Sequence, residues 1–328
     1  MKIVPPLLVV ALLATALPGE AQQAGKVPRV GLLEYPATRP GWTEPLVRTD
    51  FIRQALRDVG YLEGQNVLVE TMSANTRDFL PQLAANFVGL NVAVIVATGV
   101  EAAQAAKAVT TTIPVVMVSL ADPVELGLVA SLARPGGNVT GVSLIGAELG
   151  EKRLALVKEA VGRGSRVAVL WNPSDAAAVR EWSQIRAAAP RLGVTLISAE
   201  YRGTESIDAL FASARNARAG ALVVVLDPLT YAQGTRIVEL AAKYRLPAIY
   251  GSRAFVERGG LMAYQPSTRD MGRRVAILVD KILKGARPRD LPVEQLGEFE
   301  LVVNMKTAKA LGLQLPPSVL VLAEQIFR

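Results

Sequence analysis

Short apolar runs rich in β-branched residues alternate along this chain with longer amphipathic stretches. An apolar run bounded by polar or turn residues is typical of a strand buried on both faces. Alternation of such runs with helical patterns predicts parallel sheets covered by helices, which is an α/β fold. The predicted strands are Arg29–Leu33, Val67–Met72, Val92–Ala97, Val115–Val118, Val139–Ser143, Val167–Trp171, Val194–Ala199, Leu222–Leu226, Ala248–Tyr250 and Leu261–Ala263.

Two stretches between or after these strands carry a clear helical pattern, with an apolar residue every three or four positions. The first places on one face Phe51, Ile52, Ala55, Leu56 and Val59. The second, predicted over Thr268–Lys284, places on one face Met271, Val275, Leu278, Val279 and Ile282. Each pattern predicts a helix that packs one face against a sheet.

Ten strands are too many for one small open sheet, so we expect two similar lobes with parallel central sheets and a seam over 144–150. The predicted first lobe is 22–143 with 265–292, and the second is 144–264 with 293–328. An extended segment, Phe299–Asn304, and a helix from Lys306 complete the second lobe. Three crossings, near Leu144, Tyr264 and Val293, would then form a hinge that lets the lobes close.

The first 21 residues have the pattern of a secretory signal. Lys2 precedes an apolar stretch over 3–17, and Gly19 and Ala21 match the small-residue spacing of a cleavage site. No later stretch has the eighteen or so uncharged residues of a membrane helix. The chain has no cysteine that could carry a lipid anchor. We therefore expect cleavage after Ala21 and a periplasmic protein.

The composition excludes several kinds of chemistry. The chain has no histidine and no cysteine, so catalytic triads with histidine, thiol nucleophiles, Cys/His zinc sites and disulfides are impossible. The net charge of +7 comes from 36 basic and 29 acidic residues without a dense basic run, so nucleic acid is not an expected partner. The segment 134–138 contains two glycines but lacks the spacing of a phosphate-binding loop, and no cofactor is expected.

One motif recurs where a predicted strand ends: an acidic or amide residue is followed by proline. It occurs at Asp122-Pro123, Asn172-Pro173 and Asp227-Pro228. Such a pair is well suited to begin a helix, since Asp or Asn caps the free amides and proline fits the first turn. The alternative is functional, because ligands of open α/β sheets bind beyond the carboxyl ends of the strands.

Further polar and aromatic residues lie at the predicted strand ends. Aromatic residues make up 5% of the chain, and four of them at strand ends indicate stacking surfaces for a flat ligand, with core packing as the alternative for each. The complete set of predicted ligand-binding residues is Glu34, Tyr35, Thr98, Gly99, Ser119, Asp122, Trp171, Asn172, Asp227, Tyr250, Ser252, Tyr264 and Gln265.

These side chains suit the two ends of an amino acid. Thr98 and Ser119, with nearby helix amides, could hold a carboxylate. Glu34, Asp122 or Asp227 could pair with an ammonium group. The predicted ligand is therefore a small solute such as an amino acid or an aromatic or carboxylate compound.

Long blocks of the sequence resemble one protein family. They are GYLEGQN at 60–66 and the segments 112–141, 252–264, 279–295 and 299–313. These blocks are similar to substrate-binding proteins of ATP-binding-cassette importers of the tryptophan/tyrosine transport type, over essentially the whole chain after the signal. The resemblance implies a type 1 periplasmic binding fold, with two Rossmann-like lobes that close on a small solute. It also implies docking onto a membrane permease, and a monomer.

One departure affects the predicted hinge. Members of that family typically read MSYG where this chain has MAYQ, over Met262–Gln265. An amide therefore replaces glycine at the second crossing. Gln265 either hydrogen-bonds the solute or stabilises the hinge.

The sequence favours a receptor that captures a solute without converting it, with binding energy shifting an open–closed equilibrium. A sensory module that hands its closed form to a signalling receptor is the first alternative. A hydrolase that uses Asp122 and Asp227 across the cleft is the second.

Overall fold

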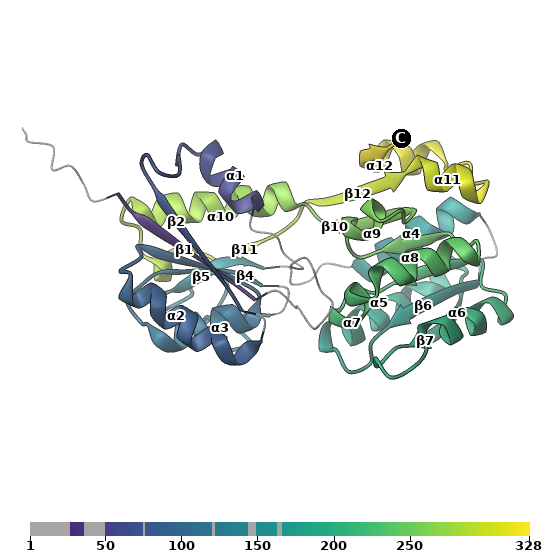
Figure 1. Cartoon of the computed structure of the whole chain (residues 1–328), viewed down its shortest axis with the longest axis horizontal. Coiled ribbons are helices and arrows are strands. Elements are labelled where there is room, and N and C mark those ends of the chain that lie inside the picture. Colours follow the sequence, from purple (N-terminus) through teal and green to yellow (C-terminus); the bar gives the residue numbers. More distant parts are fainter. Residues whose placement is uncertain (1–26, 36–49, 75, 120–121, 144–148, 163–165) are drawn as a thin grey trace, which may run out of the picture.

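A computed structural model describes residues 27–35, 50–74, 76–119, 122–143, 149–162 and 166–328. The predicted signal, 1–21, lies outside these residues. The chain forms two lobes, each built on its own sheet, and the lobes lie side by side (Figure 1). The predicted α/β fold with two mostly parallel sheets is confirmed.

The first sheet has the strand order β11-β5-β4-β3-β1-β2, and all of its neighbouring strands pair in parallel. Its strands are β1 (Arg29–Glu34), β2 (Leu68–Ser73), β3 (Val94–Thr98), β4 (Val115–Ser119), β5 (Val139–Ser143) and β11 (Glu294–Gln295). Its helical elements are α1 (Asp50–Asp58), η1 (Arg77–Phe79), α2 (Leu80–Gly89), α3 (Val100–Val109), α10 (Thr268–Leu283) and η2 (Pro288–Asp290).

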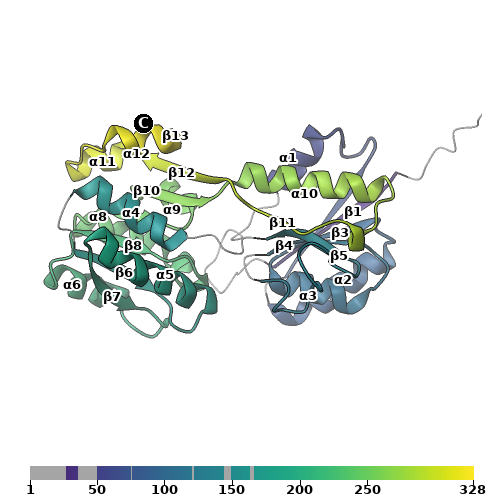
Figure 2. The ribbon, with the colours of Figure 1, turned by 180° about the vertical axis from the view of Figure 1, so that it is seen from behind.

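Helices cover both faces of the first sheet, since nearly every side chain of β1, β3, β4 and β5 is buried. On one face, Ile52 and Leu56 of α1 and Val275 of α10 pack against strand residues. On the other, Phe87 of α2 and Ala103 of α3 do so. The apolar faces predicted for 51–59 and 268–284 thus lie against the same side of one sheet, and α10 lies along it in Figure 2.

The second sheet has the order β13-β12-β10-β9-β8-β6-β7, parallel except where β10 meets β12. Its strands are β6 (Arg166–Trp171), β7 (Thr195–Glu200), β8 (Ala221–Val224), β9 (Ala248–Tyr250), β10 (Met262–Pro266), β12 (Phe299–Asn304) and β13 (Ala323–Phe327). Its helices are α4 (Leu149–Val161), α5 (Ala176–Leu192), α6 (Ile207–Asn216), α7 (Pro228–Ala232), α8 (Gly234–Lys243), α9 (Arg253–Glu257), α11 (Met305–Leu311) and α12 (Pro317–Leu322).

The chain passes between the sheets three times. The first passage falls between Ser143 and Leu149, and its residues 144–148 lie outside the described part. The second joins β10 to α10, and the third joins β11 to β12. Strand pairing puts Glu294–Gln295, expected in the second lobe, beside β5 of the first sheet, and puts Gln265, expected in the first lobe, in the second sheet. The lobe boundaries themselves stay a prediction.

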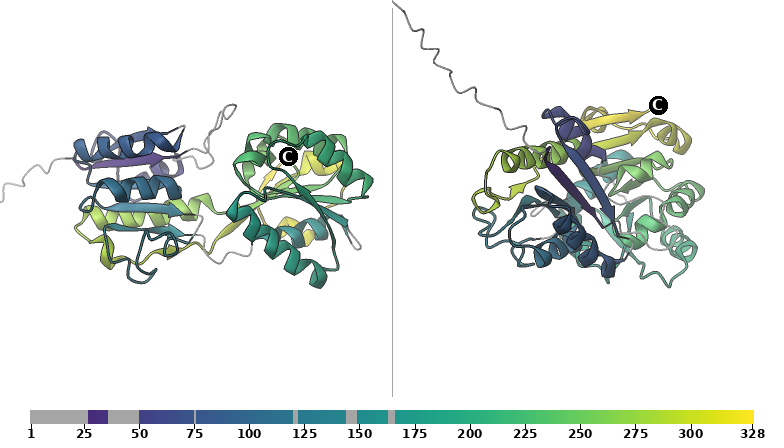
Figure 3. Two further views of the ribbon diagram at one scale, coloured as in Figure 1. Left: turned by 90° about the horizontal axis from the view of Figure 1, so that it is seen from below. Right: turned by 60° about the vertical axis from the view of Figure 1, so that its left-hand side comes forward.

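The two described passages run next to each other. β10 and β12 form an antiparallel ladder from Met262↔Val303 to Pro266↔Phe299. Beyond the ladder, the backbone N–H of Ser267 donates to the carbonyl of Glu298 over 2.9 Å. Ser267 also caps α10 through its hydroxyl, which accepts from the N–H of Asp270. Seen from below, the lobes stand apart and are joined through this region (Figure 3, left).

Two of the three predicted helix starts at an X-Pro pair are wrong. After Asp122-Pro123 the chain forms turns, and after Asn172-Pro173 the helix begins at Ala176 with Asp175 as its cap. In each case a side-chain oxygen of the first residue accepts from the N–H two residues later, which closes a turn. Asp227-Pro228 does begin a helix, α7, with a complete capping box.

Candidate functional site

In each lobe the carboxyl ends of the strands point toward the other lobe, except those of β12 and β13, which run the opposite way (Figure 1). This follows from the parallel topology, since every strand of a parallel sheet ends at the same edge. The thirteen predicted ligand-binding residues are all described, and they lie at or just beyond these strand ends or in the strand β10 that leads to the hinge. The structure therefore divides them between the two facing edges and the hinge.

In the first lobe the strand ends bring five of them onto one edge. Glu34, at the end of β1, is the register partner of Thr98 on β3. Tyr35 and Gly99 follow these two strands, and Ser119 ends β4. The N–H of Gly99 donates to the carbonyl of Val118, which fastens the loop after β3 to β4.

The polar groups on this edge are bonded within the lobe. The Glu34 carboxylate, which is 8% exposed, accepts from the Ser73 hydroxyl over 2.6 Å. The Thr98 hydroxyl donates to the carbonyl of Leu33 over 3.4 Å. Ser73 ends β2 directly beside Glu34 in the parallel register, and the sequence analysis did not single it out. The signal that could have found it is its place at the end of a predicted strand.

Asp122 lies three residues beyond β4 and is half-buried. Its Oδ1 accepts from the N–H of Val124 over 2.8 Å and from that of Glu125 over 3.4 Å. The carboxylate therefore holds a turn at the edge of the first lobe, and its half-burial leaves part of the side chain open to solvent.

In the second lobe a buried polar cluster joins the ends of β6 and β8. The Asn172 amide donates to Asp227 Oδ1 over 3.4 Å. Asp227 also accepts from the N–H of Leu229 over 2.6 Å and from the Thr230 hydroxyl over 3.0 Å. Asp227 is 2% exposed, and this burial raises the pKa of its carboxyl above the ordinary value, against the lowering effect of its hydrogen bonds. Thr230 was missed by the sequence analysis, although its spacing from Asp227 is that of a capping box.

Two of the predicted stacking residues pack inside the second lobe. The Trp171 ring stacks on Trp182 with centroids 5.2 Å apart, and its indole N–H donates to the Ser198 hydroxyl. The Tyr250 ring is 1% exposed and stacks on Phe255 at 4.8 Å. The core-packing alternative accounts for both positions, and their contact with a solute stays a prediction.

Ser252, after β9, caps α9 by accepting from the N–H of Ala254. Tyr264, on β10, is half-buried and its ring lies 5.8 Å from that of Phe299 across the β10–β12 ladder. Burial raises the pKa of Tyr264, so it stays a neutral phenol near neutral pH. Both residues lie on the side of the second lobe where the chain crosses to the first.

Gln265 is bonded within the hinge at both ends of its amide. Its oxygen accepts from the N–H of Arg253 over 2.6 Å, and its nitrogen donates to Glu300 over 2.6 Å. Glu300 lies directly opposite on β12. Of the two roles that the sequence left open, these bonds favour stabilising the hinge.

No group of three or more carboxylates among the described residues is arranged to hold a metal ion. Within the same residues, no helix combines the length and the apolar character needed to cross a membrane.

Comparison with known proteins gives a family and relatives. A family model described as ABC transporter substrate binding protein matches residues 46–327. A tyrosine-binding protein of Clostridioides difficile is 28% identical over 262 residues, which are 80% of this chain and 75% of that protein.

Two solved structures are similar over most of the chain. A structure of an ABC domain from Streptococcus pneumoniae in complex with L-Trp has a TM-score of 0.74 and 25% identity, and covers 92% of this chain and 100% of its own. A conserved domain protein from Vibrio cholerae has a TM-score of 0.74 and 27% identity with the same coverage.

Proposed function

The chain belongs to the family of ABC transporter substrate-binding proteins, and from that premise we propose that it captures an amino acid, with tyrosine and tryptophan as the first candidates, between its two lobes. The observation that carries the proposal is the pair of parallel sheets whose carboxyl ends face each other across a three-segment connection. A solute held at both edges favours the closed arrangement by the difference between its affinities for the two states. The named relatives support an aromatic amino acid.

The family is one of solute-binding proteins, not enzymes. The hydrolase alternative placed Asp122 and Asp227 in opposite lobes as a catalytic pair. Each carboxylate instead accepts hydrogen bonds from the backbone of its own lobe, at a turn for Asp122 and at the start of α7 for Asp227. Both carboxylates therefore have a structural role, which accounts for an acidic residue at each position.

Half-buried residues on the two edges are the ones we assign to direct solute contact. They are Tyr35 and Asp122 in the first lobe, and Ser252 and Tyr264 in the second. Their side chains are held by the strand ends yet keep exposed surface. The buried predicted residues, including Asp227 and Tyr250, would support these contacts from beneath.

The family makes the chain an extracytoplasmic binding component of an ABC system. We assign it further to the periplasm, through cleavage of residues 1–21, and assign delivery of the solute to a membrane permease, with the receptor acting as a monomer. The basis is the charge and apolar pattern of the first 21 residues together with the family.

Ligand-dependent thermal stabilisation tests the proposal. At a hundredfold excess over the dissociation constant, a bound solute adds about 2.7 kcal/mol to the free energy of unfolding. We expect L-tyrosine or L-tryptophan to raise the melting temperature, and D-glucose to leave it unchanged. A panel of amino acids and aromatic acids that produces no shift at all would contradict the proposal.

A matched pair of variants locates the binding surface. Ser252→Ala and Asn304→Ala each remove the side-chain cap of a short helix, but Asn304 ends the antiparallel strand β12 away from the first lobe. We expect similar losses of stability and weaker solute binding in Ser252→Ala alone. Equal affinities would remove Ser252 from the site.

A further inference from the structure

The largest side chain that is fully buried in the described residues is an arginine. Arg153, in the second turn of α4, is 2% exposed. Its Nε donates to the backbone carbonyl of Tyr264 over 2.9 Å, and its Nη1 forms an ion pair with Glu181 of α5. A buried arginine is costly unless it is paired and hydrogen-bonded, so these contacts specify its position closely.

The carbonyl that Arg153 binds lies where β10 extends beyond the end of β9, its neighbour on one side. β9 ends at Tyr250, which is the register partner of Ala263. Tyr264 therefore extends beyond β9, and Arg153 supplies the donor to its carbonyl. The guanidinium comes close to the end of β9 as well, because a Cβ at Gly251 would lie 3.4 Å from its Cζ. Arg153 thus takes the place of a strand neighbour at the last part of β10.

This contact joins the three points at which the chain enters or leaves the second lobe. α4 is the first element after the first passage, β10 is the last before the second, and β12 is the first after the third. Arg153 links α4 to β10, and the ladder with the Gln265–Glu300 hydrogen bond links β10 to β12.

We propose that Arg153 is a positioning residue. It makes the three points at which the chain enters or leaves the second lobe move as one body when the lobes open and close. The inference rests on the proposed function, because it concerns the closure that captures the solute. With these three points fixed to each other, bending in the described residues is confined to the two short connections, at Ser267 and at 296–298. The sequence analysis missed Arg153 because it lies inside a helix and far from any predicted strand end.

The experiment measures the distance between the lobes. The chain has no cysteine, so two spin labels can be placed at Gln104→Cys on α3 and Ser213→Cys on α6, both exposed. Pulsed electron paramagnetic resonance then gives the interlobe distance distribution of the full mature chain. Arg153→Met is compared with Arg191→Met, which breaks an exposed ion pair between the same two helices, Arg191 with Glu151, without touching β10.

In the solute-free protein we expect Arg153→Met to broaden the distance distribution and Arg191→Met to leave it as narrow as in the parent. With L-tyrosine or L-tryptophan added, we expect about tenfold weaker binding in Arg153→Met, because a smaller share of the molecules is competent to close. A purely structural arginine would lower the melting temperature of the variant without widening the solute-free distribution.

A folded Arg153→Met protein with the parent's distribution would overturn the proposal. If that variant does not fold, Arg153→Lys keeps a charge beside Glu181 but lacks the rigid fork of donors with which the guanidinium binds both Glu181 and the Tyr264 carbonyl, and the same comparison applies to it. If neither amino acid binds the parent, the proposed ligand is wrong, while the solute-free distributions still decide the role of Arg153.

Discussion

Two acidic residues of the second lobe have pKa values shifted in opposite directions. Burial raises the pKa of Asp227, whereas the hydrogen bond from Arg236 lowers the pKa of the exposed Asp208. The first carboxylate is thus harder to ionise in the folded protein than in the unfolded chain, and the second is easier. Their contributions to stability must change with pH in opposite directions.

Asp227→Asn tests this at the residue scale. Between the ordinary carboxyl pKa and the raised value, the native state of the parent binds more protons than the unfolded state, so the contribution of Asp227 to stability falls as pH rises. An asparagine can still cap α7 and has no charge to bury. We expect the variant to gain stability relative to the parent as the pH rises from 3.5 to 7, measured by urea unfolding.

Asp208→Asn is the control of opposite sign. Its carboxylate stabilises the fold above the ordinary pKa and loses that contribution as the pH falls through the lowered value, so this variant should lose stability relative to the parent as pH rises. The same trend in both variants would show that burial does not dominate at Asp227.

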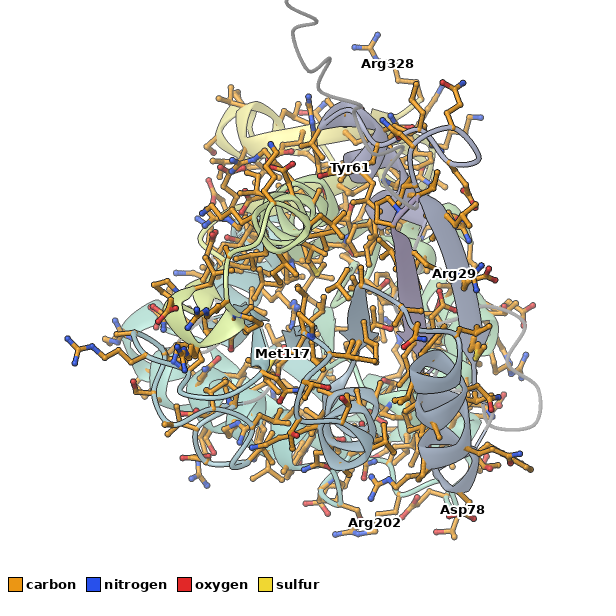
Figure 4. The ribbon with its side chains drawn as sticks, turned by 90° about the vertical axis from the view of Figure 1, so that its left-hand side faces the viewer. Arg29, Tyr61, Asp78, Met117, Arg202 and Arg328 are labelled. Atoms are coloured by element: carbon orange, nitrogen blue, oxygen red, sulfur yellow. The ribbon has the colours of Figure 1, made fainter. Side chains whose placement is uncertain are left out.

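At the scale of elements, the close approach of β4 and β5 depends on one glycine. Gly141 has φ +149°, and a Cβ there would lie 2.0 Å from the carbonyl oxygen of Met117. Met117 is fully buried and its side chain lies inside the first lobe (Figure 4). Neither the conformation nor the space admits a side chain.

Gly141→Ala should therefore lower the free energy of unfolding by at least about 3 kcal/mol, since it combines a strained backbone with overpacking. Gly137→Ala, two residues before β5, meets nothing within 4 Å and should change it by less than about 0.5 kcal/mol. Chemical denaturation measures both. A stable Gly141→Ala protein would mean that β5 can move away from β4.

At the scale of the whole molecule, the two lobes and their three connections predict a change of shape. Small-angle scattering should give a smaller radius of gyration when L-tyrosine or L-tryptophan is added, because closure brings the lobes together. D-glucose should leave it unchanged. Calorimetric binding without any decrease in the radius would contradict closure.

The periodic pattern of the sequence predicted most of the fold because both lobes rest on runs of apolar residues that are buried on two faces. All ten strands of the two main sets were found, as were the apolar faces of α1 and α10. The two-residue strand β11 and the terminal strand β13 were not predicted, since neither carries a periodic apolar signal.

From the sequence it was possible to predict which strand ends form the candidate site. The role of each side chain at the site could not be predicted, because the packing around a polar group determines its hydrogen-bond partner. Asp227 and Asn172 are 55 residues apart and meet through the neighbouring strands β6 and β8. Asp122 and Asp227 share a motif, yet one holds a turn and the other a helix.

The sequence by itself determined the strand–helix alternation, the two sheets and the family, since these follow from local pattern and from long blocks of similar residues. Only the tertiary structure decided that the Gln265 amide donates a hydrogen bond to Glu300 and that Arg153 binds a backbone carbonyl near the end of β10. Those contacts join residues 35 and 111 positions apart, and their formation depends on the register of β10 against β9 and β12, which no local pattern encodes.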